Sequence, residues 1–248
     1  MSPSTDTREN RQLASEIKFL VSRAVAAQIQ AWARAQLLPD PHASGTAGDD
    51  YTVTSLYFDT AQFDVFHRRG SFGRSKYRIR RYGESVTVFL ERKLKTRRVL
   101  TKRRSVIPIA ELDWVSAAES GSEWSGSWFQ RRLLARGLSP VCQISYERTA
   151  RVAMTQYGPI RLTLDDNLCA SRAPGLWFND TLGAPLLQDR LILELKFRFA
   201  LPAKFKYLLE EFTLTPQPFS KYRLAAAALG LVTPEPSLQK ETHAYEPA

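Results

Sequence analysis

The sequence predicts an α+β fold in which an antiparallel β-barrel forms a tunnel with a basic interior, covered by helices on the outside. Two observations support this prediction. Stretches that alternate charged and apolar residues recur along the chain, as is typical of strands with one polar and one apolar face. Shorter segments have helical spacing, and helices packed on the apolar faces of a strongly curved sheet would leave the charged faces inside.

The composition suits one large folded domain that has an anionic partner. The chain has 248 residues, 44% of them hydrophobic, and its 35 Lys and Arg against 25 Asp and Glu give a formal net charge of +10. We expect a single domain over residues 12–231, a disordered tail at 1–11 and a loose tail at 232–248. The charge alone leaves nucleic acid, phosphorylated metabolites and anionic membranes open as partners.

The sequence disfavours several classes of protein. Cys142 and Cys169 are isolated, so we expect neither a disulfide framework nor a thiolate zinc site, and a reducing compartment is the simpler reading. The three histidines lack metal-ligand spacing. No segment approaches the roughly 20 apolar residues of a membrane helix, and the polar start lacks the apolar region of a signal peptide. We therefore expect a cytoplasmic protein without direct membrane insertion.

In the first half of the chain we expect strands and one long helix. A strand at 13–20 precedes a helix that Ser22 caps and that ends near Leu38. After a loop over 39–50, strands are expected at 52–59, 76–82, 86–93 and 100–107. A short turn containing Gly83 would join the second and third of these four strands into a hairpin.

The second half begins and ends with helices and has strands between them. Helical patterns cover 109–118 and 127–136, the latter ended by Gly137. Strands are then expected at 141–153, 160–169 and 191–199. One final helix starts at Pro202, and Ser220 caps another that runs to Gly230.

The strand at 191–199 shows the alternation most clearly. Leu193 and Leu195 share one face, while Glu194 and Lys196 share the other. The same alternation groups Lys76, Arg78 and Arg80 on one strand, Glu91 and Lys93 on the next, and Arg161, Thr163 and Asp165 on a later one. A solvated outer face is the plain alternative for any single strand. Repetition on several strands, with carboxylates among the cations, instead favours a polyanion site that also holds a metal.

The spacing of the cations adds to this interpretation. Strand geometry places the three cations of Lys76-Tyr-Arg-Ile-Arg80 about 7 Å apart, a spacing that can follow successive phosphates of an extended chain. The planar guanidinium of arginine matches phosphate oxygens. By alternation Lys102 and Arg104 share a face, so both are candidates at the next strand.

Eight short motifs then occur in order. They are Glu16-Ile-Lys-Phe-Leu-Val21, Ser55-Leu-Tyr-Phe-Asp59, Lys76-Tyr-Arg-Ile-Arg80, Glu91-Arg-Lys93, Tyr146-Glu-Arg148, Arg161-Leu-Thr-Leu-Asp165, Glu194-Leu-Lys196 and Ser220-Lys221. This succession resembles the VTC domain of the vacuolar transporter chaperone complex, a polyphosphate polymerase domain of the triphosphate tunnel metalloenzymes. The resemblance runs from about residue 16 to residue 230.

The resemblance implies that ATP donates a phosphoryl group to a growing polyphosphate chain in a basic tunnel, with Mn²⁺ or Mg²⁺ as cofactor. It implies catalytic roles for Lys18, Arg78, Arg80, Lys93, Arg148, Lys196 and Lys221. The substrate-binding residues would be Glu16, Glu91, Lys102, Arg104, Tyr146, Arg161 and Ser220. Glu194 would be the metal ligand.

One departure from a related pattern separates possible branches of this superfamily. The adenylate cyclase and thiamine triphosphatase branch opens with Glu-x-Glu-x-Lys, whereas here Ala14 precedes Glu16 and Lys18. Two other readings stay open beside the polymerase: hydrolysis of triphosphate or short polyphosphate, and a non-enzymatic module that binds polyphosphate or an inositol phosphate. We expect no nucleic-acid partner, because the cations lie on strands beside carboxylates, without stacking aromatics. A separate membrane protein could export the product.

Overall fold

The computed structural model describes residues 14–41, 43, 48–95, 100–117, 121, 123–181 and 183–233. The predicted tail 1–11, the expected first strand residue Leu13, and residues 234–248 of the predicted C-terminal tail lie outside these residues. The first half contains β1 (Ala14–Ser22), α1 (Arg23–Gln36), β2 (Leu38–Pro39), β3 (Asp50–Asp59), α2 (Asp64–His67), η1 (Gly70–Arg74), β4 (Ser75–Tyr82), β5 (Thr87–Lys95) and β6 (Leu100–Pro108). The second half contains η2 (Ile109–Val115), α3 (Ser127–Leu134), β7 (Ser139–Thr155), β8 (Gly158–Arg172), β9 (Ala184–Pro185), β10 (Arg190–Arg198), α4 (Ala203–Glu211) and α5 (Lys221–Ala228).

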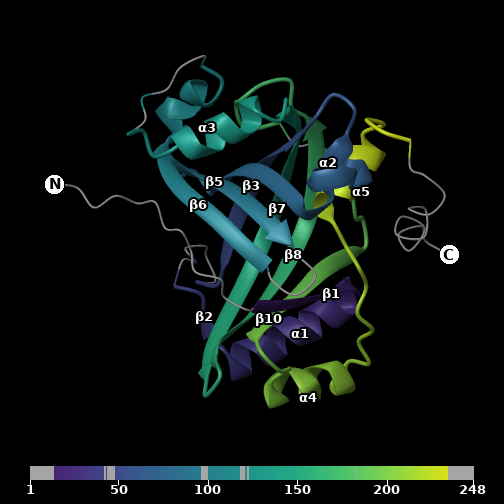
Figure 1. Cartoon of the computed structure of the whole chain (residues 1–248). Coiled ribbons are helices and arrows are strands. Elements are labelled where there is room, and N and C mark those ends of the chain that lie inside the picture. The colour runs from purple at the N-terminus through teal and green to yellow at the C-terminus, as the bar shows by residue number, and fades with distance from the viewer. Residues whose placement is uncertain are drawn as a thin grey trace.

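The strands form one large antiparallel sheet, as the predicted α+β class requires. Its strand order is β1-β10-β8-β7-β3-β4-β5-β6, with β2 paired to β7 and β9 to β8. The sheet curves strongly, so that β5 and β6 cross in front of β7 and β8 (Figure 1). We call β1, β10 and β8 the β1 arm, and β4, β5 and β6 the β6 arm. The two arms therefore face each other across a concave surface.

The structure does not show the predicted closure of this sheet into a barrel. Among the strand pairs of the described residues, none joins β1 to β6. Side chains connect the two arms instead: the ammonium nitrogen of Lys93 on β5 lies 3.0 Å from a carboxylate oxygen of Glu16 on β1. The alternating pattern predicted the curvature and the polar concave face, but it carries no information on whether the two edge strands exchange backbone hydrogen bonds.

Helices cover the apolar convex faces at two places. At one end, α1 and α4 lie against β1 and β10 (Figure 1), and Ile29, Leu195 and Phe205 are fully buried between them. At the other end, Phe129 of α3 packs edge-on against Phe58 of β3. Burial of apolar surface on the convex side thus fixes the charged residues of the same strands on the concave side.

The local signals for helix starts were correct. Ser22 accepts a hydrogen bond from the backbone N–H of Val25 at 3.3 Å, and Ser220 accepts one from Arg223 at 3.3 Å. These two caps satisfy backbone donors that the first helical turn leaves free.

Some elements differ from the expectation. The expected helix over 109–118 is a 3₁₀ segment, and the expected loop over 39–50 begins with the short strand β2. Neither α2 nor η1 was predicted. The carboxylate of Asp59 accepts backbone N–H bonds from Val65 at 2.8 Å and Phe66 at 2.9 Å, so a side chain outside the helix holds α2. A four-residue helix fixed in this way leaves no periodic apolar pattern in the sequence.

Leu195→Ala should lower the free energy of unfolding by about 3 kcal/mol, because it removes buried methyl groups and leaves a cavity beneath α1 and α4. Leu38→Ala makes the same chemical change at a side chain that is 70% exposed and should shift stability by less than about 0.5 kcal/mol. Urea denaturation of the two variants checks this. Equal losses would contradict the placement of the core.

Candidate functional site

A cavity of about 730 Å³ opens on the concave face between the two arms. Strands β1, β4, β5, β7 and β10 supply its walls, and the start of α5 closes one side. Eleven of its lining residues are cations: Lys18, Arg68, Arg74, Lys76, Arg78, Arg80, Lys93, Arg148, Lys196, Lys221 and Arg223. Two lining residues are carboxylates, Glu16 and Glu194. This excess of positive charge in a concave site suits an anion that carries several charges.

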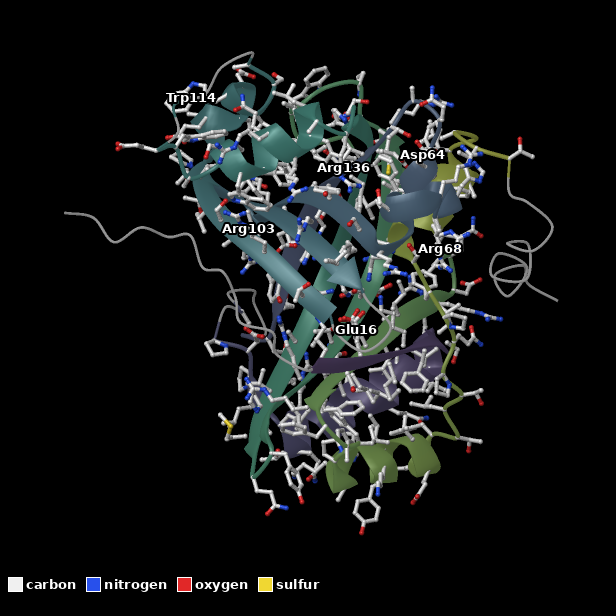
Figure 2. All side chains as sticks on the ribbon, in the orientation of Figure 1. Glu16, Asp64, Arg68, Arg103, Trp114 and Arg136 are labelled. Atoms are coloured by element: carbon white, nitrogen blue, oxygen red, sulfur yellow. The ribbon has the colours of Figure 1, made fainter. Side chains whose placement is uncertain are left out.

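The first cluster in this cavity joins the two lining carboxylates to lysines. Glu16 and Glu194 lie on neighbouring strands, where the backbone register sets Lys18 opposite Glu194 and Glu16 opposite Lys196. The ammonium of Lys18 is 3.0 Å from Glu16 and 3.5 Å from Glu194. Lys196 lies 2.7 Å from Glu194, and Lys93 reaches Glu16 from the other arm. Figure 2 shows Glu16 near the middle of the molecule, where the arms face each other.

The lysines hold both carboxylates in the charged form. Burial and the neighbouring Glu194 raise the pKa of Glu16, but the three surrounding ammonium groups outweigh them and lower it to about 2. Burial also raises the pKa of Glu194, yet Lys196 and Lys18 bring it well below its ordinary value. Both side chains are therefore anionic at neutral pH, the state in which a carboxylate can ligate a metal.

These two carboxylates fit a hard divalent cation. Mg²⁺ and Mn²⁺ prefer oxygen ligands, and Mg²⁺ is commonly held by one or two carboxylates together with substrate phosphates. The described residues contain no group of three His, Cys, Asp or Glu arranged to hold a metal. Glu16 and Glu194 would thus supply the protein's share of the ligands, and phosphate oxygens would complete the shell. The sequence assigned this role to Glu194 alone.

The second cluster surrounds Glu91, which is 1% exposed, on the β6 arm. Arg78 contacts one oxygen of this carboxylate at 2.6 Å, while Lys102 and Arg104 contact the other at 2.7 and 2.9 Å. Burial raises the pKa of Glu91, but the surrounding cations bring it well below its ordinary value. Glu91 therefore sets the position of Arg78 beside the cavity.

The two cations beyond Glu91 are placed as the alternation predicted. Lys102 and Arg104 both contact the carboxylate of Glu91, so both side chains lie on the concave face of β6. The guanidinium of Arg103 lies 4.4 Å from the ring of Trp128 on α3, on the convex side. Figure 2 labels Arg103 beside β6. Of the three consecutive cations at 102–104, Arg103 is therefore the one that faces away from the cavity.

The third cluster surrounds Asp165 on β8, which is 1% exposed. Arg148 donates to both of its oxygens, at 2.6 and 2.8 Å, and Lys221 at the start of α5 donates to the second oxygen. Burial raises the pKa of Asp165, but Arg148 and Lys221 lower it to about 2. Asp165 thereby joins a cation of β7 to a cation of α5.

Tyrosine hydroxyls bridge the cations between these clusters. Arg80 donates to the hydroxyl of Tyr146 at 3.2 Å, and Arg148 donates to the same oxygen at 3.3 Å. Arg78 donates to the hydroxyl of Tyr57 at 3.2 Å. The guanidinium groups are thus held in place before any ligand arrives, which lowers the ordering cost of binding.

The structure brings most of the predicted site residues together. The cavity is lined by Glu16, Lys18, Arg78, Arg80, Lys93, Tyr146, Arg148, Glu194, Lys196, Ser220 and Lys221. Glu91, Lys102, Arg104 and Arg161 lie outside this lining. The guanidinium of Arg161 bonds instead to Asp40 at 2.8 Å and to the hydroxyl of Tyr51 at 2.7 Å.

Several residues of the site were missed. Lys76 was recognised in the phosphate-spaced series of β4 but was assigned no role, and Asp165 was recognised only as part of a charged face. Tyr57 lies inside the quoted Ser55–Asp59 motif, so a signal existed for each of the three. Arg68 lines the cavity from the C-terminal end of α2, where its φ of 58° is left-handed. Neither the short helix nor this backbone conformation has a periodic signal in the sequence.

The sheet of this protein thus combines antiparallel strands with a cavity lined by eleven cations on its concave face. A family model described as the VTC domain matches residues 13–230. The chain therefore belongs to the VTC domain family, within the triphosphate tunnel fold.

Two solved structures have a similar fold. One is a candidate adenylate cyclase from Bacillus halodurans, with a TM-score of 0.51 and 16% identity, over 84% of this chain and 93% of the other. The second, with the same TM-score and identity over 86% and 95%, is a candidate adenylyl cyclase from Hippeastrum described as having a dominant triphosphatase activity. Among curated proteins, none matches this sequence significantly.

Asp165→Asn should lower the free energy of unfolding at pH 7 by about 3 kcal/mol, because Arg148 and Lys221 would lose a buried counter-charge. The adjacent Asp166→Asn is the matched control, since Asp166 contacts the half-exposed Arg23. It should cost less than about 1 kcal/mol. Chemical denaturation measures both values.

The loss of stability in Asp165→Asn should depend on pH, because it comes from the charge of a carboxylate. A carboxyl group whose folded pKa is lowered stabilises the fold above its unfolded pKa, and that stabilisation is lost as the pH falls through the folded pKa. The stability difference between wild type and Asp165→Asn should be full above about pH 4 and shrink toward pH 2, where Asp165 protonates. A difference that stays constant over this range would contradict the role of the carboxylate charge.

Proposed function

We propose that this domain is a metal-dependent phosphotransferase that moves the terminal phosphoryl group of ATP onto inorganic polyphosphate. The observation that supports it best is the cavity itself, where eleven cations and two adjacent carboxylates share one concave surface. Membership of the VTC family supports phosphate substrates. Phosphoryl transfer needs positioning and charge neutralisation more than covalent chemistry by the protein, and this cavity offers both.

The cations would divide the work by position. Arg78 and Arg80 on β4 present planar guanidinium groups that can each bind two phosphate oxygens. Lys18, Lys196 and Lys221 supply point charges from the other arm and from α5. Because Glu91 and Asp165 already orient their neighbours, negative charge that develops during transfer meets fixed positive groups without further rearrangement.

Two hydroxyl groups would complete phosphate binding. Tyr146 and Ser220 both line the cavity, and a hydroxyl can donate a hydrogen bond to a phosphate oxygen while it accepts one from a cation. Glu16 and Glu194 would hold a divalent metal, which when bound neutralises phosphate charge and favours transfer. Mn²⁺ and Mg²⁺ are the proposed metals.

Hydrolysis is the second candidate function. Water would replace the polyphosphate acceptor in the same cavity, and the charges that stabilise transfer would serve both reactions. The triphosphatase activity described for the Hippeastrum protein, which has the same fold, favours this alternative. The third candidate is a module that binds polyphosphate or an inositol phosphate without turnover.

The proposed function also includes a location for the domain and a partner protein. No helix in the part of the chain that the structure describes is long and apolar enough to cross a membrane. We propose a cytoplasmic domain, with a separate membrane protein as the exporter of the product.

Incubation of the full chain with ATP and Mn²⁺ or Mg²⁺ should produce long-chain polyphosphate, because the cavity can hold a donor and an extended anionic acceptor together. Gel separation of the products, stained for polyphosphate, measures the polymer. A parallel assay for orthophosphate identifies hydrolysis. Release of orthophosphate from ATP without polymer would reject the polymerase and leave the hydrolase.

Glu194→Gln should reduce metal-dependent turnover at least about 100-fold, because it removes a charged metal ligand while keeping the shape of the side chain. Glu84→Gln is the matched control, at a side chain that is 89% exposed outside the cavity, and should keep wild-type activity. Initial rates at several metal concentrations measure the effect. Binding of polyphosphate without turnover in both wild type and Glu194→Gln would support the non-enzymatic module instead.

A further inference from the structure

Three lysines lie side by side across the β6 arm. The backbone register sets Lys76 of β4 opposite Lys93 of β5, and Lys93 opposite Lys102 of β6. Like charges directly opposite each other on neighbouring strands destabilise a sheet unless other groups neutralise them. The surroundings of each lysine therefore decide whether its charge can be kept.

Two of these lysines have a carboxylate partner. Lys93 contacts Glu16 at 3.0 Å, and Lys102 contacts Glu91 at 2.7 Å. Lys76 differs: within the described part of the chain, no carboxylate lies at ion-pair distance from its nitrogen. Its nitrogen is instead 2.7 Å from the hydroxyl oxygen of Ser220, the residue that caps α5.

The charges that act most strongly on Lys76 are cations from four elements: Lys18 on β1, Arg78 on β4, Lys93 on β5 and Arg68 at the end of α2. The same cavity is lined by Arg74, Lys221 and Tyr57, and by the carboxylates Glu16 and Glu194, each of which is already paired with lysines. An amine in such a position is destabilised as an ammonium ion until an anion arrives.

We propose that Lys76 is a further phosphate-contacting residue of this cavity, uncharged while the cavity is empty and protonated when a chain of phosphates enters. The hydroxyl of Ser220 can donate its hydrogen to the neutral amine, and it can accept one from the ammonium form. On protonation, a hydronium ion or a buffer acid transfers one proton to the lysine nitrogen, so one N–H bond forms and the donor's bond to that proton breaks. The resulting ammonium group directs its positive charge at phosphate oxygens.

The direction of the pKa agrees with this assignment. Burial, followed by the charges of Lys18 and Lys93, lowers the pKa of Lys76 well below its ordinary value. A bound polyanion adds negative charge to surroundings that are mostly cationic, which raises the pKa of Lys76 again. Between the pKa of the empty cavity and that of the occupied cavity, Lys76 should make phosphate affinity fall by up to about tenfold per pH unit as the pH rises.

Proton uptake on binding tests this inference, which rests on the proposed phosphate-binding function. Calorimetric titration of the full chain with inorganic tripolyphosphate at pH 8, without metal, in buffers of different ionisation enthalpy gives the number of protons taken up. Wild type should take up more protons per tripolyphosphate than Lys76→Met, by up to about one. The ligand's own ionisation cancels in this difference.

Two further variants make the result decisive. Lys76→Arg keeps a permanent positive charge and should bind tripolyphosphate without the additional proton. This variant also gives the answer if Lys76→Met does not fold. Lys206→Met, at an exposed lysine of α4, should behave as wild type. Equal proton uptake by wild type and either Lys76 variant overturns the inference alone, whereas absence of tripolyphosphate binding to wild type overturns the proposed function as well.

Discussion

Repulsion among cations that share one concave surface is the constraint on which the rest of this structure depends. The cavity gathers eleven Lys and Arg side chains, and four carboxylates placed among or behind them make the arrangement stable. Glu16, Glu91, Asp165 and Glu194 each contact at least two cations, so each of these carboxylates serves several positive groups. The remaining excess of positive charge is what a polyanion can neutralise. The carboxylates neutralise enough of the cations for the empty cavity to be stable, and the cations that they leave unneutralised provide the affinity for a polyanion.

The strand register distributes these charges. Because Lys18 lies opposite Glu194 and Glu16 opposite Lys196, opposite signs alternate along β1 and β10 and between these two strands. On the β6 arm, Glu91 lies opposite Arg78 on one side and Arg104 on the other. Apolar residues of the same strands are buried under helices, so a slip of one residue would expose the core and reverse the charged face. The packing on the convex side thus determines the chemistry of the concave side.

The sequence determined the strands, their charged faces and two helix caps, because each depends on neighbouring residues along the chain. A period of two correctly placed Glu194 and Lys196 on one face and Leu195 on the other. The same period did not predict α2, because the carboxylate of Asp59 holds that helix. It also did not predict that the side chain of Arg161 pairs with Asp40, because Asp40 lies on a distant segment of the chain. Asp165 was recognised as part of a charged face. Its hydrogen bonds with Arg148 and Lys221 form only because α5 packs against β8. Contacts between remote elements, including the join between the two arms, depend on tertiary structure that local periodicity does not encode.

The bond between Lys93 and Glu16 connects the two arms by ionic attraction instead of by a backbone ladder. Because the side chains of Lys93 and Glu16 are only 34% and 12% exposed, dissolved salt screens this ion pair only partly. An entering phosphate also competes with Glu16 for the ammonium group of Lys93. The charge that attracts a polyanion to this cavity therefore also belongs to an ion pair that connects the two arms of the sheet.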